Sequence, residues 1–314
     1  MSDWAPYLDE ACRCFASIAK EIARFEPCLI VCDDIERVRS YFSTSGNIHF
    51  VRYQSDDTWA RDCSGITVIK EDTPVILDFD FNGWGGKFEA AQDNAMTTAI
   101  KSIYATDVKK IDFTLEGGAI DSNGSGSLLT TSRCLQNKNR NPRLSTGQIE
   151  SILKEQFGLH TLHWLHNGYL AGDDTDSHID TLARFIDKNT IMYLQCTDIN
   201  DEHFNALLKM EKELKAFRDE NNRPYRLIPL PMADAVYYEN ERLPATYANF
   251  LIINGAVLVP VYNDRHDNEV LEIFRKNFPE REVVGIDCSV LIRQHGSLHC
   301  ITMQFPQGVI LNPE

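Results

Sequence analysis

One eight-residue stretch of the sequence is rich in side chains that could do chemistry. It reads Asp173-Asp174-Thr175-Asp176-Ser177-His178-Ile179-Asp180 and holds four aspartates and one histidine. Carboxylates at this density repel one another unless a cation neutralises them. The cation could be a metal ion, since aspartate and histidine are common metal ligands. It could equally be an organic guanidinium group, whose planar set of N–H donors suits paired carboxylates.

A second candidate is Cys300, which ends the stretch His295-Gly296-Ser297-Leu298-His299-Cys300. A lone cysteine beside apolar residues is more often a small buried side chain than a nucleophile. A cysteine thiolate is nevertheless well suited to attack an electrophilic carbon. Together with the acidic run, Cys300 favours hydrolysis of a guanidinium group over a metal site. We therefore predict a cysteine nucleophile and no metal or other cofactor.

Further polar residues come just before strand-like segments, as Cys300 does. They lie in Trp59-Ala60-Arg61-Asp62, Leu115-Glu116-Gly117-Gly118 and Tyr247-Ala248-Asn249. In a repeated architecture the equivalent ends of the units converge, so these stretches should meet the acidic run and Cys300. If residues 178–180 form a strand, His178 and Asp180 point to the same face and address one ligand.

The elements that position these residues follow a repeating plan. Pairs of apolar segments around turn residues predict five β-hairpins: 66–69 with 75–79, 120 with 128–130, 182–186 with 191–194, 250–253 with 257–261, and 300–305 with 309–311. Helical patterns and single strands lie between the hairpins, so the unit reads hairpin, helix, strand. We predict one α/β domain over residues 1–314, with a quasi-fivefold arrangement of ββαβ units.

The helices are expected at six places: Trp4 to Phe25, from Asp33-Asp34 to about Phe42, from Asp93 as a cap with Met96, Ala99, Ile100 and Ile103 inward, from Ser145 with Gln148 as a capping box to Phe157, from Asn200 or Asp201 to Phe217, and from Asp267 to Phe278. Short strands are expected at 28–32 and 48–53, and others at 111–113, 162–164, 226–229 and 282–286.

The charge balance narrows the function. The chain carries 31 basic and 46 acidic residues, a formal net charge of −15. This argues against binding nucleic acid or an anionic membrane and agrees with a cationic substrate. No apolar run is long enough to span a bilayer, and the N-terminal residues show no export signal. With nine scattered cysteines, these features predict a cytoplasmic protein with reduced thiols.

The combined motifs resemble the agmatine deiminase / Porphyromonas-type peptidylarginine deiminase family of the guanidine-modifying (pentein) superfamily. The matching stretches are, in chain order, Trp59 to Asp62, Phe81-Asn82-Gly83-Trp84-Gly85-Gly86, Leu115 to Gly118, Asn139-Arg140-Asn141-Pro142, Gly172 to Asp180, and His299-Cys300-Ile301-Thr302. The resemblance covers most of the chain and implies a five-bladed α/β propeller. It also implies hydrolytic deimination through a covalent thiouronium intermediate.

By this resemblance, Cys300 is the nucleophile and His178 the general acid/base. Asp62 and Asp180 bind the guanidinium nitrogens, and Glu116 binds the substrate and assists proton transfer. The implied reaction converts agmatine and water to N-carbamoylputrescine and ammonia, a step toward putrescine and the polyamines. No cofactor is implied, and homo-oligomerisation is left open.

The substrate's far end is expected to meet a second set of residues: Trp59, Trp84, Asp174, Asp176 and Asn249. Asp174 or Asp176 would face the second cation of agmatine, and Trp84 would pack on its methylene stem. Free arginine would need a basic group such as Arg242 or Arg293 for its carboxylate.

The chain departs from the family's pattern at Gly296-Ser297-Leu298 and at Cys63-Ser64-Gly65, which leaves free arginine and peptidylarginine open as substrates. Two different functions also fit these residues. One is a metal-dependent ureohydrolase that uses Asp173, Asp174, Asp176, His178 and Asp180. The second is a non-catalytic, cation-binding propeller.

Overall fold

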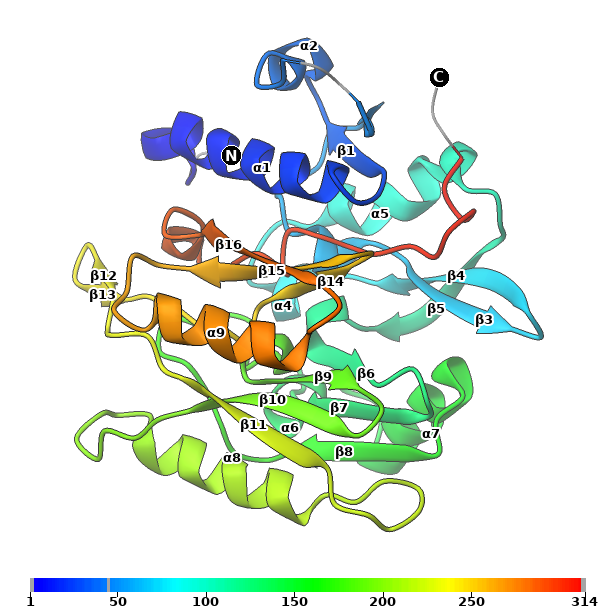
Figure 1. Ribbon diagram of the computed structural model, residues 1–314. Helices are drawn as coiled ribbons and strands as arrows, with labels where there is room; N and C mark the ends of the chain where they lie inside the picture. The colour runs from blue at the N-terminus through cyan, green and yellow to red at the C-terminus, as the bar shows by residue number, and fades with distance from the viewer. Residues whose placement is uncertain (1–2, 44–45, 312–314) are drawn as a thin grey trace.

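The computed structural model describes residues 3–43 and 46–311, and four sheets of this part share one plan (Figure 1). In each sheet an antiparallel hairpin is followed by a helix and by a strand parallel to the hairpin's second strand. This is the ββαβ unit that the sequence predicts, and the first four predicted hairpins are confirmed.

The first unit holds β3 (Ile66–Lys70), β4 (Thr73–Asp80), α5 (Ala91–Ala99) and β5 (Val108–Thr114); the second holds β6 (Ile120–Ser122), β7 (Ser127–Thr131), α7 (Thr146–Phe157) and β8 (Thr161–Leu165). The third holds β9 (Ala183–Asp187), β10 (Thr190–Gln195), α8 (Phe204–Ala216) and β11 (Arg226–Pro231); the fourth holds β14 (Leu251–Ile253), β15 (Ala256–Val261), α9 (Asp267–Asn277) and β16 (Glu282–Asp287). Helices α8 and α9 lie on the outer side of their sheets (Figure 1).

The remaining helices and strands are short apart from α1. They are η1 (Ala5–Tyr7), α1 (Leu8–Ala23), β1 (Cys28–Cys32), α2 (Ile35–Arg39), β2 (Ile48–Arg52), α3 (Ala60–Cys63), α4 (Gly83–Gly86), η2 (Lys101–Ile103), η3 (Gly117–Ala119), α6 (Ser132–Leu135), η4 (Ile179–Thr181), β12 (Tyr237–Tyr238), β13 (Glu241–Arg242) and η5 (Leu291–Gln294).

Helix α7 shows how a local signal fixes an element. Ser145 Oγ accepts from the backbone N–H of Gln148, and the Gln148 side chain accepts from the N–H of Ser145. This is the predicted capping box, which satisfies free N–H groups of the first turn. Gly158 ends the helix in the left-handed region with φ 62°.

The fifth predicted hairpin is wrong. Residues 300–305 form no strand, because Thr302 N–H turns back to the carbonyl of His299. Val309 and Leu311 instead bond to the backbone of Ala105 and Ile103. Outside the four ββαβ units, β1 and β2 from the N-terminal part of the chain pair in parallel as a separate two-stranded sheet.

Two smaller expectations are also corrected. Asp93 does not cap α5 but lies inside it, where its carboxylate accepts from the N–H groups of Asp56 and Asp57; Ala99, expected to face inward, is exposed. His178 and Asp180 do not share a strand, because residues 179–181 form the short 3-10 helix η4 and His178 is the residue before it.

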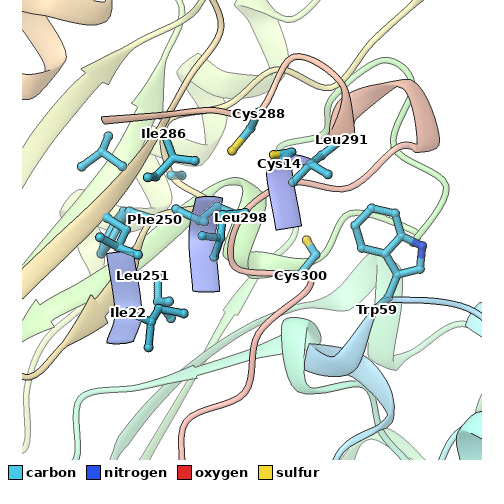
Figure 2. Packing of buried hydrophobic residues seen from close by; sticks show 14 of the residues in the cluster. Cys14, Ile22, Trp59, Phe250, Leu251, Ile286, Cys288, Leu291, Leu298 and Cys300 are labelled. Carbon is cyan, nitrogen blue, oxygen red and sulfur yellow. The ribbon is translucent and has the colours of Figure 1, made fainter. Parts of the chain in front are cut away.

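The largest apolar cluster joins α1 to the β14–β15–β16 sheet and to the segment that carries Cys300. Figure 2 shows Cys300 within it, between Leu298 and Trp59. The nucleophile candidate therefore lies at the edge of a packed core, which restricts its motion. None of the helices in the described ranges is both long and apolar enough to cross a membrane.

Candidate functional site

The stretches that precede the hairpins meet, as the sequence predicts. The Arg61 N–H donates to the carbonyl of Cys300 at 3.0 Å, and the Gly118 N–H donates to Asp62 Oδ1 at 2.9 Å. The amide of Asn249 donates to Cys300 Sγ at 3.3 Å. Four parts of the chain, far apart in sequence, thus converge on one buried place.

Cys300 is 7% exposed, and its thiol lies among groups that affect its charge. Its Sγ is 3.9 Å from Asp180 Oδ2 and 3.5 Å from Asn249 Oδ1. Burial raises the pKa of the thiol well above its usual value, and the charges of Asp180 and Asp62 raise it further. These surroundings favour the neutral thiol, and a cation bound nearby would lower the pKa of the thiol.

His178 lies opposite Asp62, with 3.6 Å between Nδ1 and Asp62 Oδ1. Burial lowers the pKa of His178, but Asp62, Cys134 and Glu116 together outweigh it and hold this pKa well above its usual value. The second oxygen of Asp62 accepts from Trp84 Nε1 at 2.9 Å. These contacts hold a protonated imidazole that can donate a proton.

Asp180 and Glu116 are fully buried, and each uses one oxygen to bind protein. His299 Nδ1 bonds Asp180 Oδ2 at 2.7 Å, and Arg140 Nε donates to Glu116 Oε1 at 2.9 Å. Among the described residues, nothing bonds Asp180 Oδ1, Glu116 Oε2 or His178 Nε2. Buried polar atoms without partners are rare and mark a place for a ligand. Burial raises the pKa of Asp180 to about 7.

The acidic run forms a tight loop in which the carboxylates of Asp173 and Asp176 bond to protein groups. Asp173 accepts from the N–H groups of Thr175 and Ser177, at 3.2 and 2.6 Å. Asp176 and Ser177 adopt φ values of 68° and 67° in the left-handed region, where non-glycine residues persist only if their surroundings hold them. Arg140 pairs with Asp176 and also donates to the Thr175 carbonyl at 3.0 Å.

Some of the residues expected at the substrate's far end already bond to other protein groups. Asp176 is paired with Arg140 and, at 3.0 Å, with Lys87 Nζ. The pKa of Asp174 is raised to about 6 by burial, with His295 opposing this shift. Asn249 bonds to Cys300, so its contacts are those of a residue that orients the thiol.

The two tryptophans are also engaged within the protein. The Trp84 indole donates to Asp62 and packs edge-on against Phe81. Trp59 lies so close to Gly296 that a Cβ there would be 2.2 Å from the Trp59 ring. Glycine is therefore required at residue 296, three residues before His299.

The acidic run is not arranged as a metal site. Two groups of three ligating side chains occur in the described residues: Glu116 with Cys134 and His178, and Asp234 with Asp264 and His266. Of the five residues that a ureohydrolase would use, only His178 belongs to either group. Asp173 accepts from a backbone N–H, Asp176 pairs with Arg140, and one oxygen of Asp180 bonds His299.

Arg140, His299 and Gly118 lie in the motifs quoted above, but we predicted no role for them from the sequence. A Cβ at Gly118 would lie 2.6 Å from His178 Nδ1 and 2.8 Å from Asp62 Oδ1, so only glycine fits there. The pairing of Gly117 with Gly118 after Glu116 was a usable signal for this close approach. Cys134, beside His178, had no such signal.

Comparison with known proteins identifies the family of the chain. The model of the Porphyromonas-type peptidyl-arginine deiminase family matches residues 1–306. The chain belongs to this family. A curated member, the agmatine deiminase of Pseudomonas aeruginosa (strain LESB58), is 33% identical over 93% of this chain and 86% of its own.

Solved structures of family members show the same mixed α/β fold. A Porphyromonas gingivalis protein, provisionally named an arginine deiminase, is 49% identical with a TM-score of 0.93, over 95% of this chain and 90% of its own. A cysteine-to-serine variant of C. jejuni agmatine deiminase, with substrate bound, is 43% identical with a TM-score of 0.90, over 95% and 88%.

Proposed function

We propose that this family member is an agmatine deiminase, which hydrolyses agmatine to N-carbamoylputrescine and ammonia. The observation that carries the proposal is the set of buried, unpartnered atoms on Asp180, Glu116 and His178, together with the 3.9 Å approach of the Cys300 thiol to the Asp180 carboxylate. A guanidinium group offers N–H donors to the two carboxylates and a carbon to the thiol. The relatives named as agmatine deiminases support agmatine as the substrate.

Binding and activation are coupled in this proposal. Asp180 and Glu116 accept from the guanidinium nitrogens and keep the group protonated, which keeps its carbon electrophilic. The bound cation offsets the carboxylates that raise the pKa of the Cys300 thiol. The thiol then loses its proton at the moment the substrate is in place, and Asn249 orients the sulfur.

The reaction follows in two steps. The Cys300 thiolate attacks the guanidinium carbon, and protonated His178 donates a proton to the nitrogen that leaves as ammonia. The product of this step is a thiouronium bound to Cys300. His178 then accepts a proton from water, the water oxygen attacks the thiouronium carbon, and the carbon–sulfur bond breaks. The sulfur of Cys300 takes up the O–H proton of the product and returns as a thiol, which balances the thiol proton released to solvent when the substrate bound, and the neutral ureido product leaves.

Asp174 is our choice for the far end of agmatine. Its carboxylate is largely buried in the loop that also carries His178, whereas Asp176 is already paired with two basic groups. We further propose that the four ββαβ units and the β1–β2 region form one domain with the quasi-fivefold, five-bladed arrangement of the pentein superfamily, and that the product enters polyamine synthesis.

A substrate comparison tests the proposal. Ammonia release is measured with agmatine, free arginine and a blocked arginine peptide, each with and without EDTA, and the product is identified by mass. We expect turnover of agmatine, a ureido product and no effect of EDTA. Preference for arginine or the peptide would overturn the substrate assignment, and loss of turnover with EDTA would favour a metal-dependent reaction.

A further inference from the structure

A group of metal-ligating side chains adjoins the candidate site. It consists of Glu116, Cys134 and His178, whose ligating atoms all lie within 4.8 Å of one another. All three side chains are buried. Cys134 comes from α6, directly after β7, and is a free thiol. The mechanism proposed above uses Glu116 and His178 but leaves Cys134 without a part.

Two of these side chains have a free buried atom. Glu116 Oε1 is taken by Arg140, but Glu116 Oε2 has no partner in the described part of the chain, and neither has His178 Nε2. A carboxylate, an imidazole and a thiol thus lie together, and the carboxylate and the imidazole each have one buried atom without a hydrogen bond. Such atoms gain more from a cation than atoms that are already bonded.

The donor set selects a kind of ion. A thiolate with an imidazole suits zinc and similar thiophilic ions, whereas magnesium and calcium prefer oxygen ligands. We propose that Zn²⁺ binds Glu116, Cys134 and His178 and thereby blocks the site. Binding releases two protons to solvent, one from the Cys134 thiol and one from the protonated imidazole of His178, because the ion needs the free electron pair of a ring nitrogen.

The geometry requires only small movements. Zinc holds sulfur at about 2.3 Å and nitrogen or oxygen at about 2.0–2.2 Å, so tetrahedral ligand atoms lie about 3.6 Å apart. Because the ligand atoms lie within 4.8 Å of one another, the three ligands must approach one another by up to about 1.2 Å. Arg140, bonded to Glu116, opposes a cation here, and Asp62, 3.6 Å from His178, favours one.

Inhibition by zinc rests on the proposed function, whereas binding of the ion does not. A zinc ion on these residues withholds His178 from proton transfer and Glu116 from the guanidinium group. Zinc and agmatine then compete for the same side chains. We therefore expect zinc to act as a competitive inhibitor whose effect EDTA reverses.

Cobalt(II) spectroscopy tests binding without reference to activity. The metal-free full chain is titrated with Co²⁺, and the thiolate-to-cobalt absorption is recorded for wild type, Cys300→Ala, Cys134→Ala and Cys134→Ser. We expect the band in wild type and in Cys300→Ala, and its loss in both Cys134 variants, with circular dichroism showing that they are folded. No band in wild type, or a band that requires Cys300 and not Cys134, would overturn the proposal.

Zinc inhibition of agmatine turnover is then compared, each variant against its own rate without zinc. Loss of one of three ligands should raise the inhibitory Zn²⁺ concentration of Cys134→Ser about tenfold or more. Equal inhibition of wild type and Cys134→Ser would contradict the blocking role. If agmatine is not a substrate, the cobalt band still decides the metal site, so the two proposals fail separately.

Discussion

At the scale of single residues, the candidate site depends on positions where the backbone lies so close to other side chains that only glycine fits. Gly118 is the sharpest case, because its missing side chain leaves room for His178 and its N–H bonds Asp62. Asp180, Glu116 and His178 each have one buried atom without a partner in the described part of the chain, which a guanidinium group could serve in the proposed function. The contacts of Gly118 and Asp62 with His178 therefore affect both where the imidazole lies and whether it is protonated.

Replacing Gly118 by alanine should disable the site without unfolding the protein. The new Cβ would lie 2.6 Å from His178 Nδ1 and must displace the imidazole. We expect kcat/KM for agmatine to fall about 100-fold or more, since small misplacements of catalytic groups cost this much. Gly147→Ala is the matched control, because nothing lies within 4 Å of a Cβ there. Equal activity of the two variants would refute the argument.

The pH dependence follows from Asp180 and His178. Asp180, with a pKa of about 7, must be ionised to accept a guanidinium N–H, so kcat/KM should rise as the pH increases through about 7. His178, whose pKa is well above its usual value, must stay protonated, so the fall should come only at alkaline pH. A kcat/KM profile measured with agmatine checks this. A rising limb near the ordinary aspartate pKa would contradict it.

At the scale of elements, Arg140 connects the loops that carry the site. It bonds Glu116 on one side and Asp176 with the Thr175 carbonyl on the other. Its side chain is fully buried. Arg140 thus helps to hold the loop that contains His178 and the two residues with positive φ, Asp176 and Ser177.

Arg140→Met should therefore affect both stability and turnover. Removing one partner of a buried ion pair leaves uncompensated carboxylates and costs about 3–5 kcal/mol. We expect a lower midpoint in urea denaturation and a fall in kcat with agmatine. Arg143→Met, at an exposed position nearby, serves as the control. Unchanged stability and kcat in Arg140→Met would show that the loop is held by other contacts.

Sequence patterns predicted most elements because the signals were local. The turns at Glu71-Asp72 and Asn254-Gly255 separate apolar runs and gave the right hairpins. The same reasoning failed after Cys300, where residues 309–311 look like a strand partner but bond to residues 103–105. That pairing joins distant parts of the chain, so no local pattern reveals it.

Some of the candidate site residues could be predicted from the sequence and others could not. The stretches holding Cys300, Glu116 and Asp62 were recognisable because each precedes a strand-like segment or belongs to a family motif. Cys134 could not be predicted as a neighbour of His178, because the two residues are 44 positions apart in sequence and only the fold brings α6 to His178. The occupation of Asp176 by Arg140 likewise depends on the packing of two loops and not on spacing in sequence.

At the scale of the whole molecule, the net charge of −15 should act on a cationic substrate before it reaches the site. Added salt screens such attraction, since the Debye length is about 10 Å at 0.1 M. We expect kcat/KM for agmatine to fall several-fold from low to high ionic strength, with kcat nearly constant. A kcat/KM that does not change with sodium chloride would show that distant charges are unimportant.

The central claim is that the Cys300 thiol attacks the substrate. The most direct test measures ammonia release from agmatine by Cys300→Ala, with Cys288→Ala as a matched buried-cysteine control, and measures agmatine binding to both by calorimetry. The account predicts that Cys300→Ala binds agmatine but releases no ammonia above background, while Cys288→Ala remains active. Turnover by Cys300→Ala near the wild-type rate would contradict the account.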